Sequence, residues 1–182
     1  MKYDFGPEQI CVPLTRGKFA TVDVGDLPLI CSLKWYAKFS RGTWYAAHKP
    51  RSAKAITMHR LISGATGNEM VDHRNGNGLI NRRHNLRIGS STQNSGNRKT
   101  SGKFGFKGVV KHPYQNTYAA EIRVCGKTKR VWRCPTIVDA ALSYDDLARE
   151  HFGKFACVNF PRPGERSALT GEIMPLEERV SA

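Results

Sequence analysis

The sequence predicts a fold of the α+β class, in which antiparallel strands and helices occupy separate stretches of the chain. Short runs of β-branched and aromatic residues, divided by Gly and Pro, fill residues 18–62 and indicate a small antiparallel sheet. Three more strand-like runs lie within residues 104–134, and residues 135–153 change to apolar positions at helical spacing. A chain of 182 residues is long enough for two small domains, each with its own core.

The strand predictions follow the chain order. In the N-terminal region the runs are KFATVDV, WYAKFS, TWYAAHK and AITMHRLIS, and LPLICSLKWY holds a helical turn. In the C-terminal region FKGVVKH, TYAAEIRV and KTKRVWRC form a three-stranded meander with turns at PYQN and CGK. A helix between Thr136 and Gly153 packs on one face of this sheet. The tail from Pro161 has no clear period, so we expect it to be mobile or loosely packed.

The charge of the chain points to a polyanionic partner. Its 29 Lys and Arg outnumber its 15 Asp and Glu, which gives a formal net charge of +14. A membrane surface would attract the same charge, but no run of about 18 apolar residues is present and no amphipathic helix gathers the basic residues. The first ten residues lack an apolar signal core. We therefore expect a cytoplasmic protein that binds nucleic acid and has no membrane partner.

The five cysteines are an odd, widely spaced set without a CxxC pair. This pattern argues against a disulfide framework and against a zinc knuckle. We expect each of them to be a small buried apolar residue. They are Cys11, Cys31, Cys125, Cys134 and Cys157.

Residues 71–97 are rich in Asn and Arg, and their only acid, Asp72, directly precedes His73. Hydrolysis of a phosphodiester needs a base for water and a cation near the phosphate, with groups that hold both. A neutral His is a suitable base near pH 7, and Mg²⁺ or Mn²⁺ prefers carboxylate and amide oxygens. The residues for one divalent metal site are Asp72, His73, Asn85 and Asn94.

The order of elements around these residues is specific. EMVDH ends a strand, RNGNGLIN forms a loop, HNLRIGS returns as a second strand, and STQNSGNRK begins a helix capped by Ser91 or Thr92. This arrangement would bring Asp72 and His73 to Asn94, while Asn85 ties down the loop. Taken alone, an Asp-His pair is more often a turn cap beside a satisfied loop histidine, so the whole pattern carries the prediction.

The stretch DHRNGNGLINRRHNLR followed by TQNSGN resembles the His-Asn-His (HNH) nuclease motif, in the variant of phage homing endonucleases in which the last His is Asn. The intervals of twelve residues from His73 to Asn85 and nine from Asn85 to Asn94 fit, as do MHRLISG, GKFATVD and KWY upstream. The resemblance implies a ββα-metal core at about residues 69–99. It makes His73 the general base, Asp72 and Asn94 the metal ligands, and Asn85 the residue that orients the base and the loop.

Other polar residues of this stretch have expected roles as well. Arg82, Arg83 and Arg87 are candidate phosphate contacts. His59 matches a recurrent upstream position and would pack or bind phosphate, and His84 would face solvent. No acid occurs between His73 and Glu121, whereas nine basic residues do, so a polyanion is expected along the whole region. The basic residues are Arg74, Arg82, Arg83, Arg87, Arg98, Lys99, Lys103, Lys107 and Lys111.

The C-terminal segments FKGV, YAAEIRV, KRVW, DAALSYDDLA and VNF are similar to the Apetala-two or ethylene-response-factor type of DNA-binding domain. In that family a three-stranded sheet enters the major groove. Val110, His112, Tyr114, Arg133 and Cys134 depart from its pattern, so the target sequence is not carried over. For Trp132 the alternative is a partly buried aromatic that supports the sheet. The resemblance implies DNA contacts at Lys107, Gly108, Glu121, Arg123, Arg130 and Trp132.

These observations predict a metal-dependent endonuclease of homing type that nicks or cleaves double-stranded DNA. We expect an HNH nuclease domain at residues 1–99, a linker at 100–103, a DNA-binding domain at 104–160 and a tail at 161–182. We expect it to act as a monomer, inside a bacterial host cell if a phage encodes it. One alternative is a DNA-binding protein with a decayed nuclease motif. Another is a module that binds or cleaves RNA.

Overall fold

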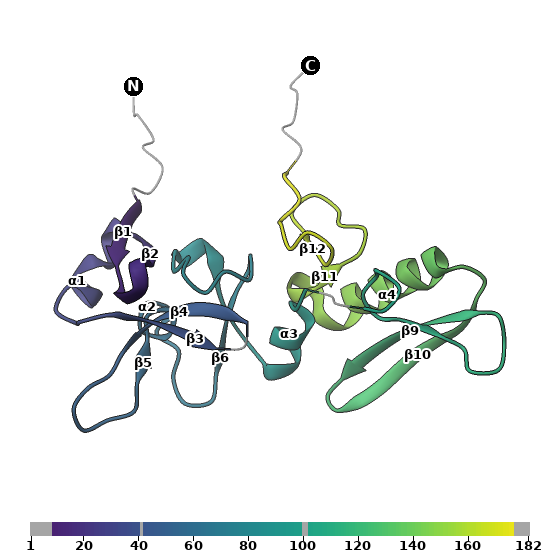
Figure 1. Cartoon of the computed structure of the whole chain (residues 1–182), viewed down its shortest axis with the longest axis horizontal. Helices are drawn as coiled ribbons and strands as arrows, with labels where there is room; N and C mark the ends of the chain where they lie inside the picture. The colour runs from purple at the N-terminus through teal and green to yellow at the C-terminus, as the bar shows by residue number, and fades with distance from the viewer. Residues whose placement is uncertain (1–8, 41, 100–101, 177–182) are drawn as a thin grey trace, which may run out of the picture. The chain divides into compact units, whose positions relative to one another are not determined.

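The computed structural model describes residues 9–40, 42–99 and 102–176. It is a mixed α+β structure, as predicted, with several small antiparallel sheets and one long helix near the C-terminus (Figure 1). By its internal contacts the chain divides into two compact units, Met1–Gly89 and Ser90–Ala182. Within the described residues no helix is long and apolar enough to cross a membrane. The linker residues 100–101 and the tail residues 177–182 lie outside the described residues.

The first unit consists of two hairpins, a three-stranded sheet and two short helices. Strands β1 and β2 pair with each other, β4 lies between β3 and β5, and β6 pairs with β7; all these pairs are antiparallel. The elements are β1 (Gln9–Pro13), η1 (Thr15–Gly17), β2 (Phe19–Asp23), η2 (Val24–Asp26), α1 (Leu27–Ile30), β3 (Tyr36–Ser40), β4 (Thr43–His48), β5 (Ile56–Thr57), α2 (Met58–Ser63), β6 (Met70–His73), η3 (Arg83–Asn85) and β7 (Leu86–Gly89).

The predicted strands at KFATVDV, WYAKFS and TWYAAHK and the helical turn α1 are confirmed. The prediction for AITMHRLIS is wrong, because only Ile56 and Thr57 are extended and α2 follows. Met58 and Ile62 are four residues apart, so a helix places both on one face, where they are buried in the core of the unit. The strand β1 was not predicted.

The second unit contains the predicted meander and its helix. The sheet has the antiparallel order β10, β9, β8, and α4 packs against all three strands. A Thr136–Asp139 capping box begins α4, and Gly153 ends it. The elements are α3 (Ser91–Gly96), β8 (Val109–Lys111), β9 (Tyr118–Val124), β10 (Lys127–Cys134), α4 (Ile137–Phe152), η4 (Gly153–Phe155), β11 (Cys157–Val158) and β12 (Arg166–Ser167).

The predictions for the tail and for the cysteines are partly wrong. Part of the tail is packed, because β12 (Arg166–Ser167) pairs with β11 and the Arg149 guanidinium donates to both carboxylate oxygens of Glu165 at 2.9 Å, whereas Met174 and Leu176 are exposed. The buried Asp145 carboxylate accepts hydrogen bonds from the backbone N–H groups of Asn159 and Phe160, which fixes the start of this segment. Within the described residues none of the five cysteines forms a disulfide. Two are buried and three are exposed, so the exposed ones lack the expected packing role: Cys11, Cys31 and Cys125.

Candidate functional site

The predicted strand, loop, strand and helix around His73 are present as β6, the loop 74–82, β7 and α3. Helix α3 is capped by Ser90, whose side chain and that of Gln93 form a capping box, rather than by Ser91 or Thr92. By its contacts α3 belongs to the second unit, together with α4. Asp72, His73 and Asn85 therefore lie in the first unit, and Asn94 lies in the second.

His73 is a buried imidazole whose Nε2 has a defined partner. Its side chain is 5% exposed, and Nε2 lies 3.2 Å from Oδ1 of Asn81. The Asn81 amide nitrogen donates to the Leu79 carbonyl, so Oδ1 faces the imidazole and Nε2 of His73 is the donor. Burial lowers the pKa of His73, against the opposing effects of Asn81 and Asp72. The imidazole is therefore neutral at pH 7, with Nδ1 as its proton-accepting atom.

A second histidine, His59, lies against His73. The two rings meet edge to face with centroids 5.0 Å apart, and the Tyr45 ring lies within 6 Å of both. Nε2 of His59 is 3.1 Å from the Thr57 hydroxyl, and Nδ1 is a buried atom with no hydrogen-bond partner in the described residues. Burial lowers the pKa of His59 to about 3, helped by His73 and Arg60. His59 therefore packs against His73, and packing is one of the two roles predicted for it.

The loop between β6 and β7 is held by Asn85. Its side chain accepts from the Asn75 backbone N–H at 3.1 Å and donates to Asn75 Oδ1 and to the Ile80 carbonyl at 3.1 and 2.8 Å. Asn85 is 3% exposed, so these bonds replace water that the amide would otherwise bind. Asn81, a fully buried residue of this loop that contacts His73, was not singled out from the sequence, because nothing in its spacing distinguishes it from its Asn neighbours.

The three arginines predicted to contact phosphate all meet carboxylates of the first unit. Arg87 lies opposite Asp72 in the β6–β7 ladder, and both its Nε and its terminal nitrogen donate to Asp72 Oδ2. Arg82 donates to Asp23 at 2.7 Å, and Arg83 donates to the buried Asp26. If a phosphate binds one of these guanidiniums, the guanidinium must contact the phosphate and its carboxylate partner at the same time.

The donors near His73 fit a hard divalent cation rather than a soft one. Within the part of the chain that the structure describes, no three His, Cys, Asp or Glu side chains gather closely enough to hold a metal ion. A cation at Asp72 would take its other ligands from amide, water or phosphate oxygens, which is coordination that Mg²⁺ accepts. Asn94, the other predicted ligand, lies on α3 in the second unit.

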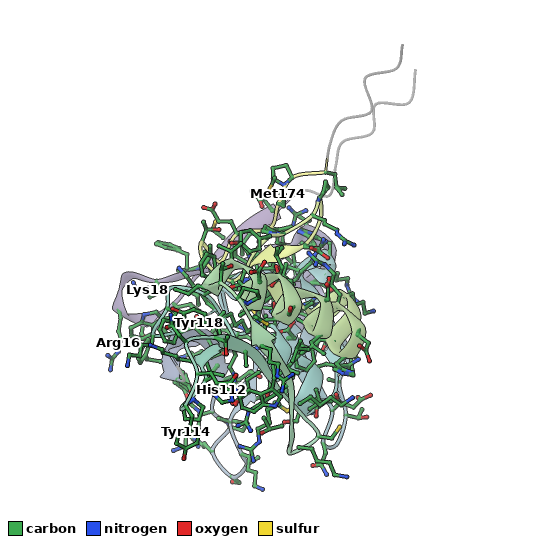
Figure 2. The ribbon with its side chains drawn as sticks, turned by 90° about the vertical axis from the view of Figure 1, so that its right-hand side faces the viewer. Arg16, Lys18, His112, Tyr114, Tyr118 and Met174 are labelled. Atoms are coloured by element: carbon green, nitrogen blue, oxygen red, sulfur yellow. The ribbon has the colours of Figure 1, made fainter. Side chains whose placement is uncertain are left out.

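The second unit presents an exposed row of charged and aromatic side chains on its sheet. Arg130 donates to Glu121 at 2.6 Å, and its guanidinium lies over the Trp132 ring at 5.3 Å. His112 meets Trp132 at 5.2 Å, and Tyr114 beside it is 92% exposed (Figure 2). Trp132 is 46% exposed, so nearly half of its surface is open to a partner, and the alternative of a partly buried aromatic that supports the sheet stays open. Glu121, Arg130 and Trp132 are therefore accessible to a partner.

Lys107 and Gly108, also predicted to contact DNA, are engaged within the second unit. The Lys107 ammonium donates to the carbonyls of Gly96 and Cys157 at 2.7 and 3.1 Å, and burial lowers its pKa to about 8. Gly108 has φ +72°, and a Cβ there would lie 1.9 Å from the Tyr144 ring. Glycine at this position is explained by the close packing of Tyr144, with no need for a DNA contact.

Two relatives match the chain. A protein of Acanthamoeba polyphaga mimivirus described as an uncharacterized HNH endonuclease is 32% identical over 151 residues, which cover 79% of this chain and 76% of that protein. The chain belongs to the HNH endonuclease family. An ethylene-responsive transcription factor of Arabidopsis thaliana is 36% identical over 106 residues, 55% of this HNH family member and 65% of the factor. No protein-family model and no solved structure matches the chain.

Proposed function

We propose that this HNH family member is a metal-dependent endonuclease that hydrolyses phosphodiester bonds in double-stranded DNA. The observation that carries the proposal is the buried, neutral His73, whose Nε2 is held by Asn81 beside the carboxylate of Asp72. A neutral imidazole with a fixed tautomer is the arrangement that a general base requires.

In the proposed reaction Nδ1 of His73 accepts a proton from a water molecule, and the water oxygen forms a bond to the phosphorus. The bond from phosphorus to the leaving deoxyribose oxygen breaks, and that oxygen is protonated by solvent. Asn81 keeps the imidazole in the tautomer that accepts at Nδ1. Asn85 holds the loop that carries Asn81, so it acts on the base indirectly.

Asp72 would bind one divalent metal, Mg²⁺ or Mn²⁺, through its carboxylate, and the family resemblance implies the amide oxygen of Asn94 as the second protein ligand. When bound, the cation would neutralise charge on the phosphate and on the leaving oxygen. Arg87 fixes one oxygen of the Asp72 carboxylate, which limits how that group can turn. If phosphates bind at the three arginines of the first unit, each guanidinium would keep its ion pair with a carboxylate at the same time; these arginines are Arg82, Arg83 and Arg87.

The sheet of the second unit would bind duplex DNA through Glu121, Arg123, Arg130 and Trp132. The relative named a transcription factor and the net charge of +14 support DNA as the partner. A phage origin, use in homing, a cytoplasmic site of action and a monomeric state stay predictions of the sequence.

The ion pairs of the first unit favour one alternative, a DNA-binding protein with a decayed nuclease. Asp72 and the three arginines all have structural partners, so the fold explains them without catalysis. Such a protein would bind duplex DNA with strong salt dependence and would cleave nothing.

Cleavage assays separate the two functions. Wild-type and His73→Ala protein are incubated with supercoiled and linear duplex DNA in Mg²⁺, in Mn²⁺ and in chelator. If the protein is a nuclease, open circles or defined fragments should appear only with wild-type protein and only with metal. The ratio of open circles to linear fragments distinguishes nicking from double-strand cleavage. Tight, salt-sensitive binding without cleavage in either metal would leave the DNA-binding alternative.

A further inference from the structure

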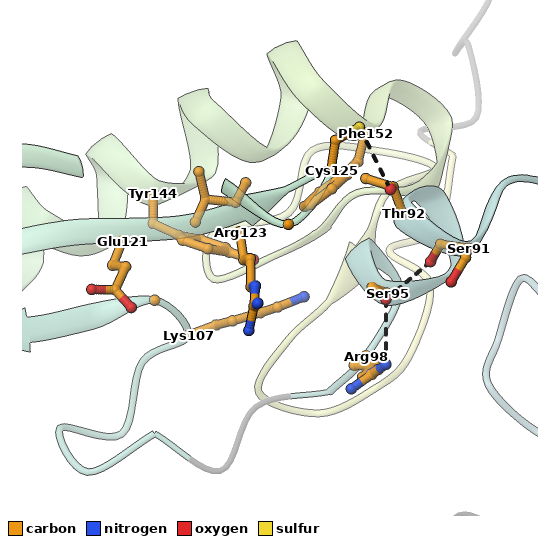
Figure 3. Close-up of a pocket in the computed structure, with 13 residues that line it drawn as sticks. Ser91, Thr92, Ser95, Arg98, Lys107, Glu121, Arg123, Cys125, Tyr144 and Phe152 are labelled. Carbon is orange, nitrogen blue, oxygen red and sulfur yellow. Dashed lines mark hydrogen bonds between the residues drawn. The ribbon is translucent and has the colours of Figure 1, made fainter. Parts of the chain in front are cut away.

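An open pocket of about 530 Å³ lies within the second unit, between α3, β9 and α4 (Figure 3). We name it the α3–β9 pocket. Its polar lining comes from residues far apart in sequence: Ser91, Ser95, Arg98, Lys107 and Arg123. Figure 3 shows the side chains of Arg98, Lys107 and Arg123 extending to the same side of the pocket.

The α3–β9 pocket has a positive charge that the fold does not neutralise. Arg98 and Arg123 are exposed, and neither has a carboxylate partner within the described residues. The one acid in the lining, Glu121, is bonded to Arg130 at 2.6 Å. Lys107 adds a third cation, whose donors reach two backbone carbonyls. Three cations around one opening favour an anionic ligand.

The pocket also has groups that orient its cations. The Ser95 hydroxyl donates to the Ser91 carbonyl at 2.9 Å and lies 3.3 Å from a terminal nitrogen of Arg98. This bond holds the Arg98 guanidinium next to α3. Arg123 extends from the opposite wall, on β9, as Figure 3 shows. Two guanidiniums that approach from two walls suit the tetrahedral oxygens of a phosphate.

Helix α3 is fastened to the rest of the second unit. A Cβ at Gly96 would lie 2.5 Å from the Phe152 ring, so only glycine permits this approach of α3 to α4. Lys107 binds the Gly96 carbonyl, and Arg166 donates to the Asn97 carbonyl at 2.6 Å. The wall that carries Ser95 and Arg98 is thereby fixed with respect to the sheet.

We infer that the α3–β9 pocket binds one phosphate of the DNA backbone, held between Arg98 and Arg123. This inference rests on the proposed function only in taking duplex DNA as the partner. It assigns a DNA contact to Arg98 and makes Arg123 a reader of the backbone rather than of a base. Because α3 also carries Asn94, a bound phosphate sets the position of that amide along the DNA. The phosphate contact would then fix the positions of the sheet and of Asn94, the proposed metal ligand, along the same duplex.

The test is equilibrium binding of fluorescent duplexes to the full chain in chelator, where no cleavage occurs. Each variant is measured on several unrelated sequences and over a range of salt: Arg98→Ala, Arg123→Ala, the double variant, and Arg162→Ala. Arg162 is an exposed arginine of the same unit and controls for the loss of one charge.

Arg98→Ala and Arg123→Ala should each lower the affinity for duplex DNA about tenfold, and by a similar factor on every sequence. In each variant the slope of log affinity against log salt concentration should decrease by the amount that corresponds to about one phosphate contact. Because both hold the same phosphate, the double variant should lose less than the product of the two single effects. Arg162→Ala should change affinity less than either. A loss at Arg123 that depends on sequence, full additivity, or an Arg98→Ala variant no weaker than Arg162→Ala would overturn the inference.

A second arm identifies the source of the phosphate. Inorganic phosphate at constant ionic strength should displace DNA no better than chloride does if the pocket needs the polymer. If wild type binds inorganic phosphate at low millimolar concentration in calorimetry without DNA, the double variant does not, and the duplex affinity of wild type is unchanged by that phosphate, the ligand is a free phosphate and the DNA contact is rejected. If wild type binds DNA but never cleaves it, the nuclease proposal fails and the pocket result stands. If wild type does not bind duplex DNA, both fail.

Discussion

Two ion pairs of the same chemistry occupy the same place in two antiparallel ladders. Asp72 lies directly opposite Arg87 between β6 and β7, and Glu121 lies directly opposite Arg130 between β9 and β10. The side chains of the first pair are 6% and 11% exposed, whereas those of the second are 34% and 42% exposed. Burial therefore decides what each arginine can do. The Arg87 guanidinium is buried against Asp72, whereas the Arg130 guanidinium is exposed and can contact a partner.

The contrast extends to the two units. In the first unit the polar side chains near His73 bond to one another, so their geometry exists before any ligand arrives. In the second unit the sheet presents arginines and aromatic rings to solvent. A preorganised buried site suits chemistry, and an exposed charged surface suits binding. The predictions below test this division, from the largest expected effect to the smallest.

Loss of the base should affect cleavage alone. His73→Ala is expected to lower the cleavage rate by about two to four orders of magnitude, because a general base acts on the reaction and adds little to binding. Duplex affinity in chelator should stay within about threefold of wild type. The control is His84→Ala, an exposed histidine eleven positions away that should leave both readouts unchanged. An equal loss of binding in His73→Ala would make His73 a structural residue.

Removal of the buried arginine should destabilise the first unit. Arg87→Ala leaves the Asp72 carboxylate buried without its partner, and we expect a decrease of about 3–5 kcal/mol in the free energy of unfolding. Urea denaturation in a Trp132→Phe background isolates this unit, because the two remaining tryptophans, Trp35 and Trp44, both belong to it. A change below about 1 kcal/mol would show that the pair is not part of the stable core.

The stability of the first unit should decrease as the pH falls below 6.5. His59 has a pKa of about 3 in the folded chain and about 6.5 when unfolded, and the pKa of His73 is lowered as well. Below pH 6.5 the unfolded chain binds more protons, so each histidine removes up to about 1.4 kcal/mol per pH unit. Urea midpoints at pH 7 and pH 5 measure the loss. His59→Leu should flatten the dependence, and His84→Ala should not.

The sequence predicts the sheet and helix of the second unit well, because the signals are local. Alternation, turn residues and the Thr136 and Gly153 boundaries are all contained within the segments that they define. The prediction for AITMHRLIS failed because the β-branched residues Ile56, Thr57 and Ile62 dominate a short window. The helix is selected instead by contacts of Met58 and Ile62 with the distant core.

The candidate site is predicted only in part for the same reason. Asp72, His73 and Asn85 follow from spacing, since all lie on one hairpin. The roles of Asn81, Lys107 and Arg87 depend on atoms brought from elsewhere by the fold: the His73 ring, two backbone carbonyls and a cross-strand carboxylate. A basic residue in a basic stretch has no sequence feature that distinguishes a buried ion pair from a phosphate contact.

Loss of the exposed aromatic should affect binding more than stability. Trp132 is 46% exposed and lies under Arg130, so Trp132→Ala should change the free energy of unfolding by less than about 1 kcal/mol. Duplex affinity should fall about three- to tenfold if the ring packs on DNA. Circular dichroism and fluorescence anisotropy on the same samples measure the two effects. A stability loss without a binding loss would return Trp132 to the role of sheet support.

The exposed ion pair gives the smallest stability effect and the most direct comparison with Arg87. Arg130→Ala should lower the free energy of unfolding by less than about 1 kcal/mol, because water solvates the carboxylate of Glu121 that is left behind. Glu121→Gln removes the partner instead and leaves the Arg130 guanidinium free of its carboxylate. If Arg130 contacts phosphate, this variant should bind duplex DNA more tightly and Arg130→Ala more weakly. Equal weakening in both would mean that DNA recognises the pair as a unit, with Glu121 accepting from a base edge while Arg130 holds it in place.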